Sequence, residues 1–62
     1  MLNYYYCREI DKTFYDLGYC LAEVVAVANA QQTIIDVFRC IEYGDGHEDI
    51  LHLASINPGT ED

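Results

Sequence analysis

The stretch TIIDVFRCIEYGDGHEDILHLASI, residues 33–56, decides the fold. Two runs rich in Ile, Val, Phe and Leu flank Gly44-Asp45-Gly46-His47, and neither run contains Gly or Pro. An Asp-Gly pair between alternating apolar runs is a strong short-range signal for a β-hairpin. We therefore expect strands over residues 33–43 and 49–56, joined by a turn at 44–47.

The flanking sequence predicts one more strand, one helix and an acidic tail. Residues 2–10 alternate and contain three consecutive tyrosines, which are strong β formers. Residues 13–31 carry apolar side chains at helical spacing, with Thr13 as a candidate N-cap. Asn57-Pro58-Gly59 ends the last strand and opens the tail, residues 57–62. The sequence thus predicts a small single α+β domain in the order β-α-β-β, a three-stranded sheet with one helix packed on one face.

A two-residue turn at Asp45-Gly46 predicts a sheet that is apolar on both faces. That register pairs Ile41 with Ile50, Val37 with Ala54, and Ile35 with Ile56. One helix can cover only one face, and a large exposed apolar patch usually marks an interaction site. We expect a homodimer through the second face, formed either by the set around Ile41 and Ile50 or by the set Phe38, Cys40, Leu51 and Leu53.

The charge balance predicts a basic protein as partner. The 62 residues include 11 acidic and 3 basic ones, a net charge of -8, while 52% of the chain is hydrophobic. Such a chain should fold and present a negative surface, which repels nucleic acid and anionic membranes and attracts basic proteins. Carboxylates in a row can stand in for the phosphates of DNA. The candidate partner-binding acids are Glu9, Asp11, Asp16, Glu42, Asp45, Glu48 and Asp49.

No motif predicts catalysis, a metal or a cofactor. The three cysteines form no Cys-x-x-Cys pair, and His47 and His52 complete no familiar zinc spacing. The hairpin acids lack the spacing of an EF-hand loop. The predicted register places His52 opposite Arg39, on the face away from Cys40, which separates a nucleophile from its base. We expect a non-enzymatic protein.

The expected location is the cytoplasm, because no signal peptide or membrane-spanning segment precedes the reduced cysteines.

In size, acidity and lack of catalytic residues the chain resembles small inhibitors that phages and mobile elements encode against host enzymes, including anti-CRISPR proteins and uracil-DNA glycosylase inhibitors. The resemblance covers composition and size. It implies an inhibitor or DNA mimic, often dimeric, acting in the host cytoplasm if the chain is phage-encoded.

Overall fold

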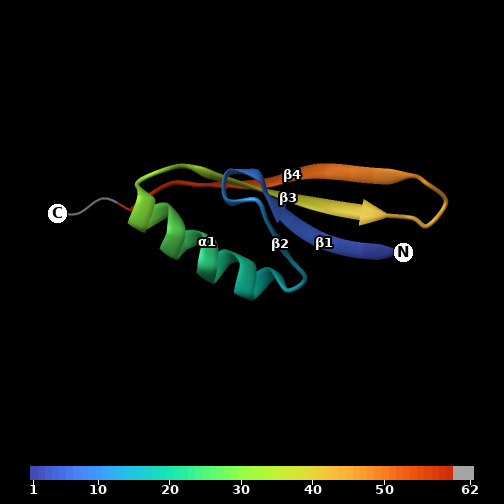
Figure 1. Cartoon of the computed structure of the whole chain (residues 1–62), viewed down its shortest axis with the longest axis horizontal. Coiled ribbons are helices and arrows are strands. Elements are labelled where there is room, and N and C mark those ends of the chain that lie inside the picture. Colours follow the sequence, from blue (N-terminus) through green and yellow to red (C-terminus); the bar gives the residue numbers. More distant parts are fainter. Residues whose placement is uncertain (60–62) are drawn as a thin grey trace.

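The computed structural model describes residues 1–59 and contains one helix on a four-stranded antiparallel sheet (Figure 1). The elements in chain order are β1 (Leu2–Cys7), the 3-10 helix η1 (Arg8–Ile10), β2 (Lys12–Phe14), α1 (Leu17–Gln31), β3 (Ile35–Glu42) and β4 (Glu48–Ile56). The sheet order is β2-β1-β3-β4. The α+β class is confirmed, whereas the predicted strand count of three is wrong. Of the predicted acidic tail, residues 60–62 lie outside the described residues.

The single strand predicted over residues 2–10 is a hairpin in the structure. β1 ends at Cys7, the chain turns through η1, and β2 returns antiparallel with Phe14 opposite Tyr5. Asp11 adopts a left-handed conformation with φ of 47°, which Asp tolerates better than most residues, and it accepts a hydrogen bond from the Tyr6 hydroxyl at 2.8 Å. Phe14 therefore reaches the core from a strand rather than from the helix.

α1 begins later than the sequence predicts and ends where it predicts. Its N-cap is Asp16, whose carboxylate accepts a hydrogen bond from the Tyr19 backbone N–H at 2.8 Å. Thr13, the expected cap, lies in β2. Asp caps a helix at least as well as Thr, because its carboxylate also meets the positive end of the helix dipole. The helix stops at Gln31, and Gln32 caps it in the left-handed region with φ of 51°.

The core lies between α1 and the half of the sheet that α1 covers. Its fully or nearly buried members are Cys7, Phe14, Cys20, Val24, Ala28, Ile35 and Val37. Cys20, Val24 and Ala28 recur every four residues and form the inward stripe of the helix. Val25, next to Val24 in the chain, lies outside this stripe and is 45% exposed. The rest of the sheet extends beyond the helix, so the molecule measures 49 × 16 × 16 Å (Figure 1).

The turn between β3 and β4 is one residue longer than predicted. The Tyr43 N–H donates to the His47 carbonyl at 3.0 Å, which leaves Gly44, Asp45 and Gly46 as a three-residue loop. Both glycines have positive φ, 87° and 89°, a region that side chains with a Cβ rarely occupy. The longer loop shifts the register, so that Cys40 faces Ile50 and the predicted pairing of Ile41 with Ile50 is wrong.

A β-bulge in β4 reverses this shift before the strands reach the core. Phe38 pairs with His52 and Val37 pairs with Ala54, so Leu53 is the extra residue. A one-residue slip exchanges the two faces of a strand, and the bulge therefore returns the predicted residues to the helix side. The predicted pairs of Val37 with Ala54 and of Ile35 with Ile56 are confirmed on the core side of the bulge.

Candidate functional site

The part of the hairpin that projects beyond the helix, residues 39–51, is called the hairpin arm below (Figure 1). Its acidic residues Glu42 and Glu48 lie directly opposite each other at the last pair before the loop. Directly opposite residues share a face, and like charges there destabilise the strand pair. Among residues 1–59 the ion pairs are Lys12–Glu23 and His52–Asp36, so neither glutamate has a cationic partner in that range.

Two further acids of the arm have structural partners. Asp45 accepts a hydrogen bond from the His47 backbone N–H at 2.9 Å and holds the loop. Asp49 accepts one from the Tyr43 hydroxyl at 2.8 Å, which raises the pKa of that phenol. Each carboxylate has acceptor sites to spare, so both still add negative charge to the tip. The arm thus gathers four of the seven acids predicted to bind a partner.

The other three predicted acids lie toward the helix end and serve the fold. Glu9 Oε1 accepts the Asp36 backbone N–H at 3.0 Å, Asp11 accepts the Tyr6 hydroxyl, and Asp16 caps the helix. Because these carboxylates satisfy local donors far from the loop, the seven acids do not form one surface. The sequence pattern carries no sign of this division, since it depends on which donor each side chain meets.

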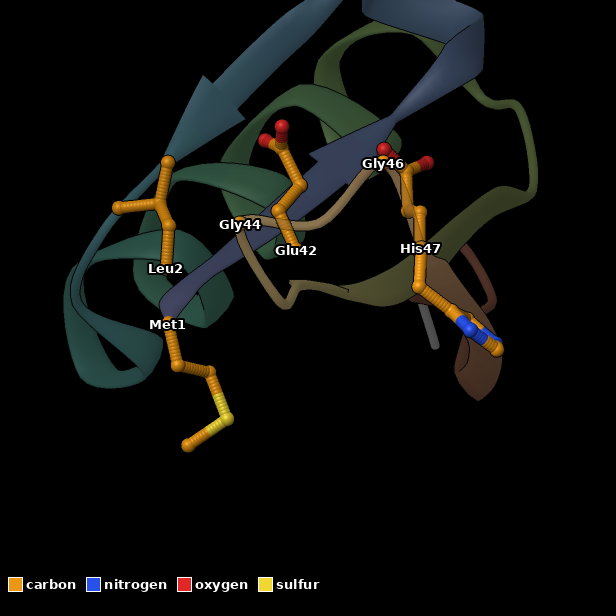
Figure 2. A pocket seen from close by; sticks show the side chains of 7 residues that line it. Met1, Leu2, Glu42, Gly44, Gly46 and His47 are labelled. Atoms are coloured by element: carbon orange, nitrogen blue, oxygen red, sulfur yellow. The ribbon is translucent and has the colours of Figure 1, made fainter.

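An open hollow of about 480 Å³ lies beside the two glutamates. Figure 2 shows Met1 and Leu2 on one side of Glu42 and His47 on the other. Glu48, Gly44 and Gly46 complete the lining. Apolar side chains next to two carboxylates suit a lysine or arginine, whose methylenes pack on apolar surface while the charged end meets an acid.

Tyr4 lies in the negative potential of this face. Its pKa is raised to about 12, first by burial and then by the carboxylates of Glu42 and Glu48. The negative charges disfavour a phenolate, which would be another anion. The same field favours any cation that approaches the outer face, which is the face turned away from α1.

The four residues predicted for self-association do not share one face. Phe38 and Cys40 lie on the outer face with Tyr4, Tyr6 and Ile50, as the pairings of β3 with its two neighbours require. Leu51 lies opposite Arg39, on the other face, and Leu53 is the extra residue of the bulge. Cys40 is only 4% exposed, whereas Ile50 is 62% exposed and Phe38 is partly exposed.

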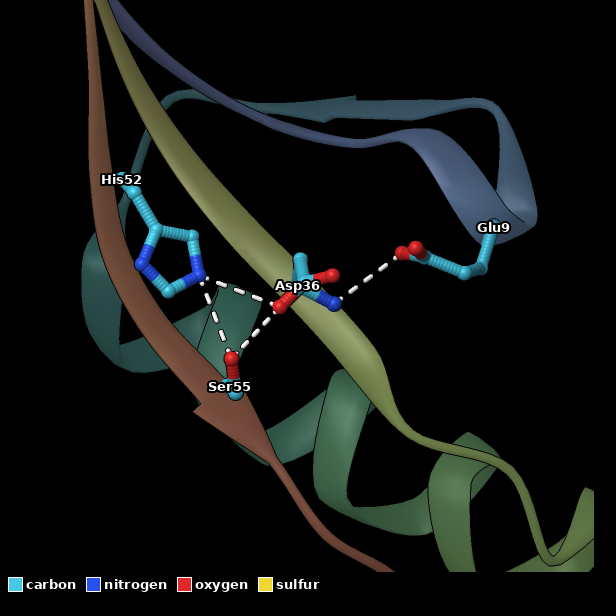
Figure 3. Close-up of polar contacts among 4 residues, drawn as sticks. All are labelled: Glu9, Asp36, His52 and Ser55. Carbon is cyan, nitrogen blue, oxygen red and sulfur yellow. Dashed lines mark hydrogen bonds and ion pairs between the residues drawn. The ribbon is translucent and has the colours of Figure 1, made fainter.

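The bulge also brings together three polar residues that the sequence did not suggest as a group. His52 Nε2 lies 3.0 Å from Asp36 Oδ1 and 3.2 Å from Ser55 Oγ, and Ser55 Oγ donates to Asp36 Oδ1 at 2.5 Å (Figure 3). His52 and Ser55 come from β4 and Asp36 from β3. Since His52 faces Phe38 rather than Arg39, the predicted placement of His52 on the face away from Cys40 is wrong.

This cluster does not have the geometry of a catalytic triad. A relay needs the serine on one imidazole nitrogen and the carboxylate on the other. Here Ser55 and Asp36 both meet Nε2, and the Ser55 hydroxyl is bonded to the carboxylate itself. The bonds from Ser55 and His52 lower the pKa of Asp36, so they hold a charged carboxylate between the strands. The cluster stabilises the bulge.

The cysteines and the acids offer no second chemical centre in the described part of the chain. Cys7, Cys20 and Cys40 are free and buried, and burial is the main cause that raises the pKa of each thiol. No three His, Cys, Asp or Glu side chains of residues 1–59 are placed to hold a metal ion. Nor does this range contain a helix long and apolar enough to cross a membrane.

No protein-family model, no curated protein and no solved structure matches this chain. The support for a function therefore comes from the hairpin arm and its charges.

Proposed function

We propose that this protein is a non-enzymatic interaction protein that binds a basic, nucleic-acid-handling protein through its hairpin arm and inhibits it. Its negative charges take the place of nucleic-acid phosphates on the basic surface of that partner, in the cytoplasm of the cell where the partner works. The observation that carries the proposal is the directly opposed pair Glu42 and Glu48, which has no cationic partner among residues 1–59.

The opposed glutamates favour binding because a partner's cation relieves their repulsion. Like charges at directly opposite positions cost the strand pair a fraction of a kcal/mol, on the order of 0.5. A lysine or arginine that enters between them removes this cost and adds charge-assisted hydrogen bonds. The relieved repulsion and the added hydrogen bonds both favour binding of a cation at this pair.

The apolar surroundings supply the rest of the contact. Met1 and Leu2 are 81% and 48% exposed and flank the hollow beside Glu42 (Figure 2). On the same outer face lies a second, mainly apolar hollow of about 240 Å³, lined by Tyr6, Arg8, Phe38, Cys40 and Ile50. An acidic end joined to an apolar strip fits a partner surface that alternates basic and apolar side chains, as phosphate-binding surfaces do when aromatic residues lie beside lysines.

Self-association through the sheet face is the weaker candidate. The set expected for it, Phe38, Cys40, Leu51 and Leu53, is divided by the bulge between the two faces. Only Phe38 and Cys40 remain together, and Cys40 is nearly covered.

A pull-down tests the proposal. The tagged protein is incubated with host-cell lysate at low and at high salt, and the retained proteins are identified by mass spectrometry. We expect a basic nucleic-acid-binding protein that is retained at low salt and lost at high salt, because screening weakens exposed ion pairs. Retention that is independent of salt would contradict an electrostatic mimic.

Two charge-matched variants locate the site. Glu42→Gln with Glu48→Gln removes two charges from the arm, and Glu61→Gln with Asp62→Asn removes two from the chain end. We expect the first variant to lose the partner and the second to keep it. Equal loss in both variants would mean that net charge alone matters, and the arm would not be the site.

A further inference from the structure

β4 is an edge strand whose free side is open. The sheet order is β2-β1-β3-β4, and no described element pairs with the edge of β4 that points away from β3. An edge strand with unpaired N–H and C=O groups is a template for another strand. Ile50 and Leu51 on this strand are 62% and 52% exposed.

The hydrogen bond at the loop identifies which residues present their backbone to solvent. Tyr43 and His47 form a hydrogen-bonded pair. In an antiparallel ladder such pairs alternate with pairs whose backbone groups point away from the partner strand. The outward-pointing residues of β4 are therefore Glu48, Ile50 and His52, paired across from Glu42, Cys40 and Phe38. The bulge at Leu53 interrupts this alternation.

These three residues are complementary to a second copy of themselves. When two β4 strands run antiparallel about a two-fold axis at Ile50, Ile50 meets Ile50 of the second copy. Glu48 then lies directly opposite His52 of the second copy, and His52 opposite Glu48. All three outward residues pair, which forms about six backbone hydrogen bonds because each hydrogen-bonded pair exchanges two.

Other registers pair these residues less well. An axis at Asp49 places two Asp49 carboxylates directly opposite each other, which is unfavourable. An axis at Leu51 leaves Glu48 opposite Ala54, whose backbone groups point inward to Val37 beyond the bulge. The register centred on Ile50 alone uses every outward group, covers the most exposed large apolar side chain of β4, and places an acid beside an imidazole.

We infer that the protein forms a homodimer by antiparallel pairing of β4 with β4 of a second copy, centred on Ile50. The two sheets join into one continuous sheet, and the two hairpin arms overlap side by side at its centre. Glu42 lies on β3 and stays outside the pairing. This dimer does not rest on the proposed inhibitor function.

The mass in solution is the first test. Sedimentation equilibrium should show a mass that rises with concentration from 7.1 kDa to twice that value. Because each chain carries a charge of -8, added salt should strengthen the dimer. The salt response is thus opposite to that expected for a basic partner. A mass that stays at 7.1 kDa at all concentrations and salts would overturn the inference.

A matched pair of substitutions tests the backbone pairing. Ile50→Pro removes an outward N–H that has no partner within the chain, so the fold should survive and the dimer should be lost. Ile50→Val keeps that donor and should keep the dimer. Circular dichroism checks that Ile50→Pro is folded. A folded Ile50→Pro variant that still dimerises would place the interface elsewhere.

A cysteine pair tests the register independently of that variant. Ile50→Cys places two thiols at the axis, where paired Cα atoms lie about 5.5 Å apart and a disulfide can form. Leu53→Cys, at another exposed position of β4, places its two thiols far apart. With oxidised glutathione as oxidant, we expect cross-linked dimer from Ile50→Cys only. Equal cross-linking at both positions would contradict this register.

Discussion

The Glu9 carboxylate takes the place of a strand on the backbone of Asp36. Its Oε1 accepts the Asp36 N–H at 3.0 Å, one step beyond the last pair of β1 and β3, Tyr6 with Phe38 (Figure 3). β1 ends just before it could supply a carbonyl to this N–H. The side chain of Glu9 thus completes the ladder where the main chain turns away into η1.

Removing this acceptor should destabilise the fold without affecting the arm. For Glu9→Ala we expect a loss of about 1 kcal/mol in the free energy of unfolding, because the Asp36 N–H loses its partner. Glu9→Gln keeps an acceptor oxygen and should retain most of the stability. Urea denaturation measures both. Partner retention in the pull-down should be unchanged by Glu9→Gln, and a loss there would mean that Glu9 belongs to the binding surface.

Asp16 should contribute to stability as the cap of α1. Asp16→Ala removes the acceptor of the Tyr19 N–H, and we expect a cost of about 1 kcal/mol in the free energy of unfolding. Asp16→Ser retains a capping oxygen and serves as the control. Thermal or urea unfolding followed by circular dichroism distinguishes them. If Thr13 capped the helix instead, Asp16→Ala would be nearly neutral and Thr13→Ala costly.

Stability should fall in acid partly because of Asp36. Hydrogen bonds from Ser55 and then His52 hold the pKa of Asp36 below its ordinary value of 3.8. A carboxyl with a depressed folded pKa stabilises the fold above the unfolded pKa and loses that contribution as pH falls through the folded pKa. Below about pH 4 the stability of Asp36→Asn should therefore fall less steeply than that of the natural protein.

A second variant separates the contribution of Ser55 to the lowered pKa of Asp36 from that of His52. Ser55→Ala removes the first cause, so the pKa of Asp36 should rise toward its ordinary value. NMR titration of the Asp36 carboxyl carbon measures the change directly. An unchanged titration curve in Ser55→Ala would show that the short Ser55–Asp36 contact does not set the charge state.

Changing Glu48 should affect stability and binding in opposite directions. Glu48→Lys places a cation directly opposite Glu42, and we expect the hairpin to gain about 0.5 kcal/mol when measured at high dilution. The same variant should retain less of a basic partner, because the free acidic pair is gone. Glu48→Gln removes the repulsion without adding a charge. Its stability and its retention of the partner should therefore lie between those of the natural protein and of Glu48→Lys. A destabilised Glu48→Lys would contradict the assigned pairing.

The buried thiols should resist modification in the folded protein. Burial raises the pKa of Cys7 to about 12, so almost no thiolate exists at neutral pH, and Cys7 and Cys20 are fully covered. Labelling with iodoacetamide at pH 8 should be slow and should accelerate with urea in step with global unfolding. Rapid labelling of Cys7 in water would indicate local opening between β1 and α1.

The sequence by itself determined the charge, the end of α1, and the two strands of the hairpin. The alternation of apolar residues and the Asp45-Gly46 turn signal each involve a few neighbouring positions. Both can therefore be recognised without knowing the rest of the structure. The pairing of Ile35 with Ile56, predicted from a two-residue turn, is present only because the bulge offsets the longer loop. The break after Cys7 was not predicted, since residues 8–10 contain no Gly or Pro that would mark a turn.

Tertiary structure decided the register of the hairpin arm and the role of each acid. Gly44 and Gly46 both take positive φ, which lengthens the loop by one residue, and the bulge at Leu53 corrects the slip so that Val37 still packs against α1. No local pattern encodes two compensating shifts. Likewise Glu9 and Asp16 stabilise the fold because each accepts a hydrogen bond from a backbone N–H, whereas Glu42 and Glu48 lie opposite each other. A carboxylate's function depends on the donor placed beside it, and that placement is a property of the folded chain.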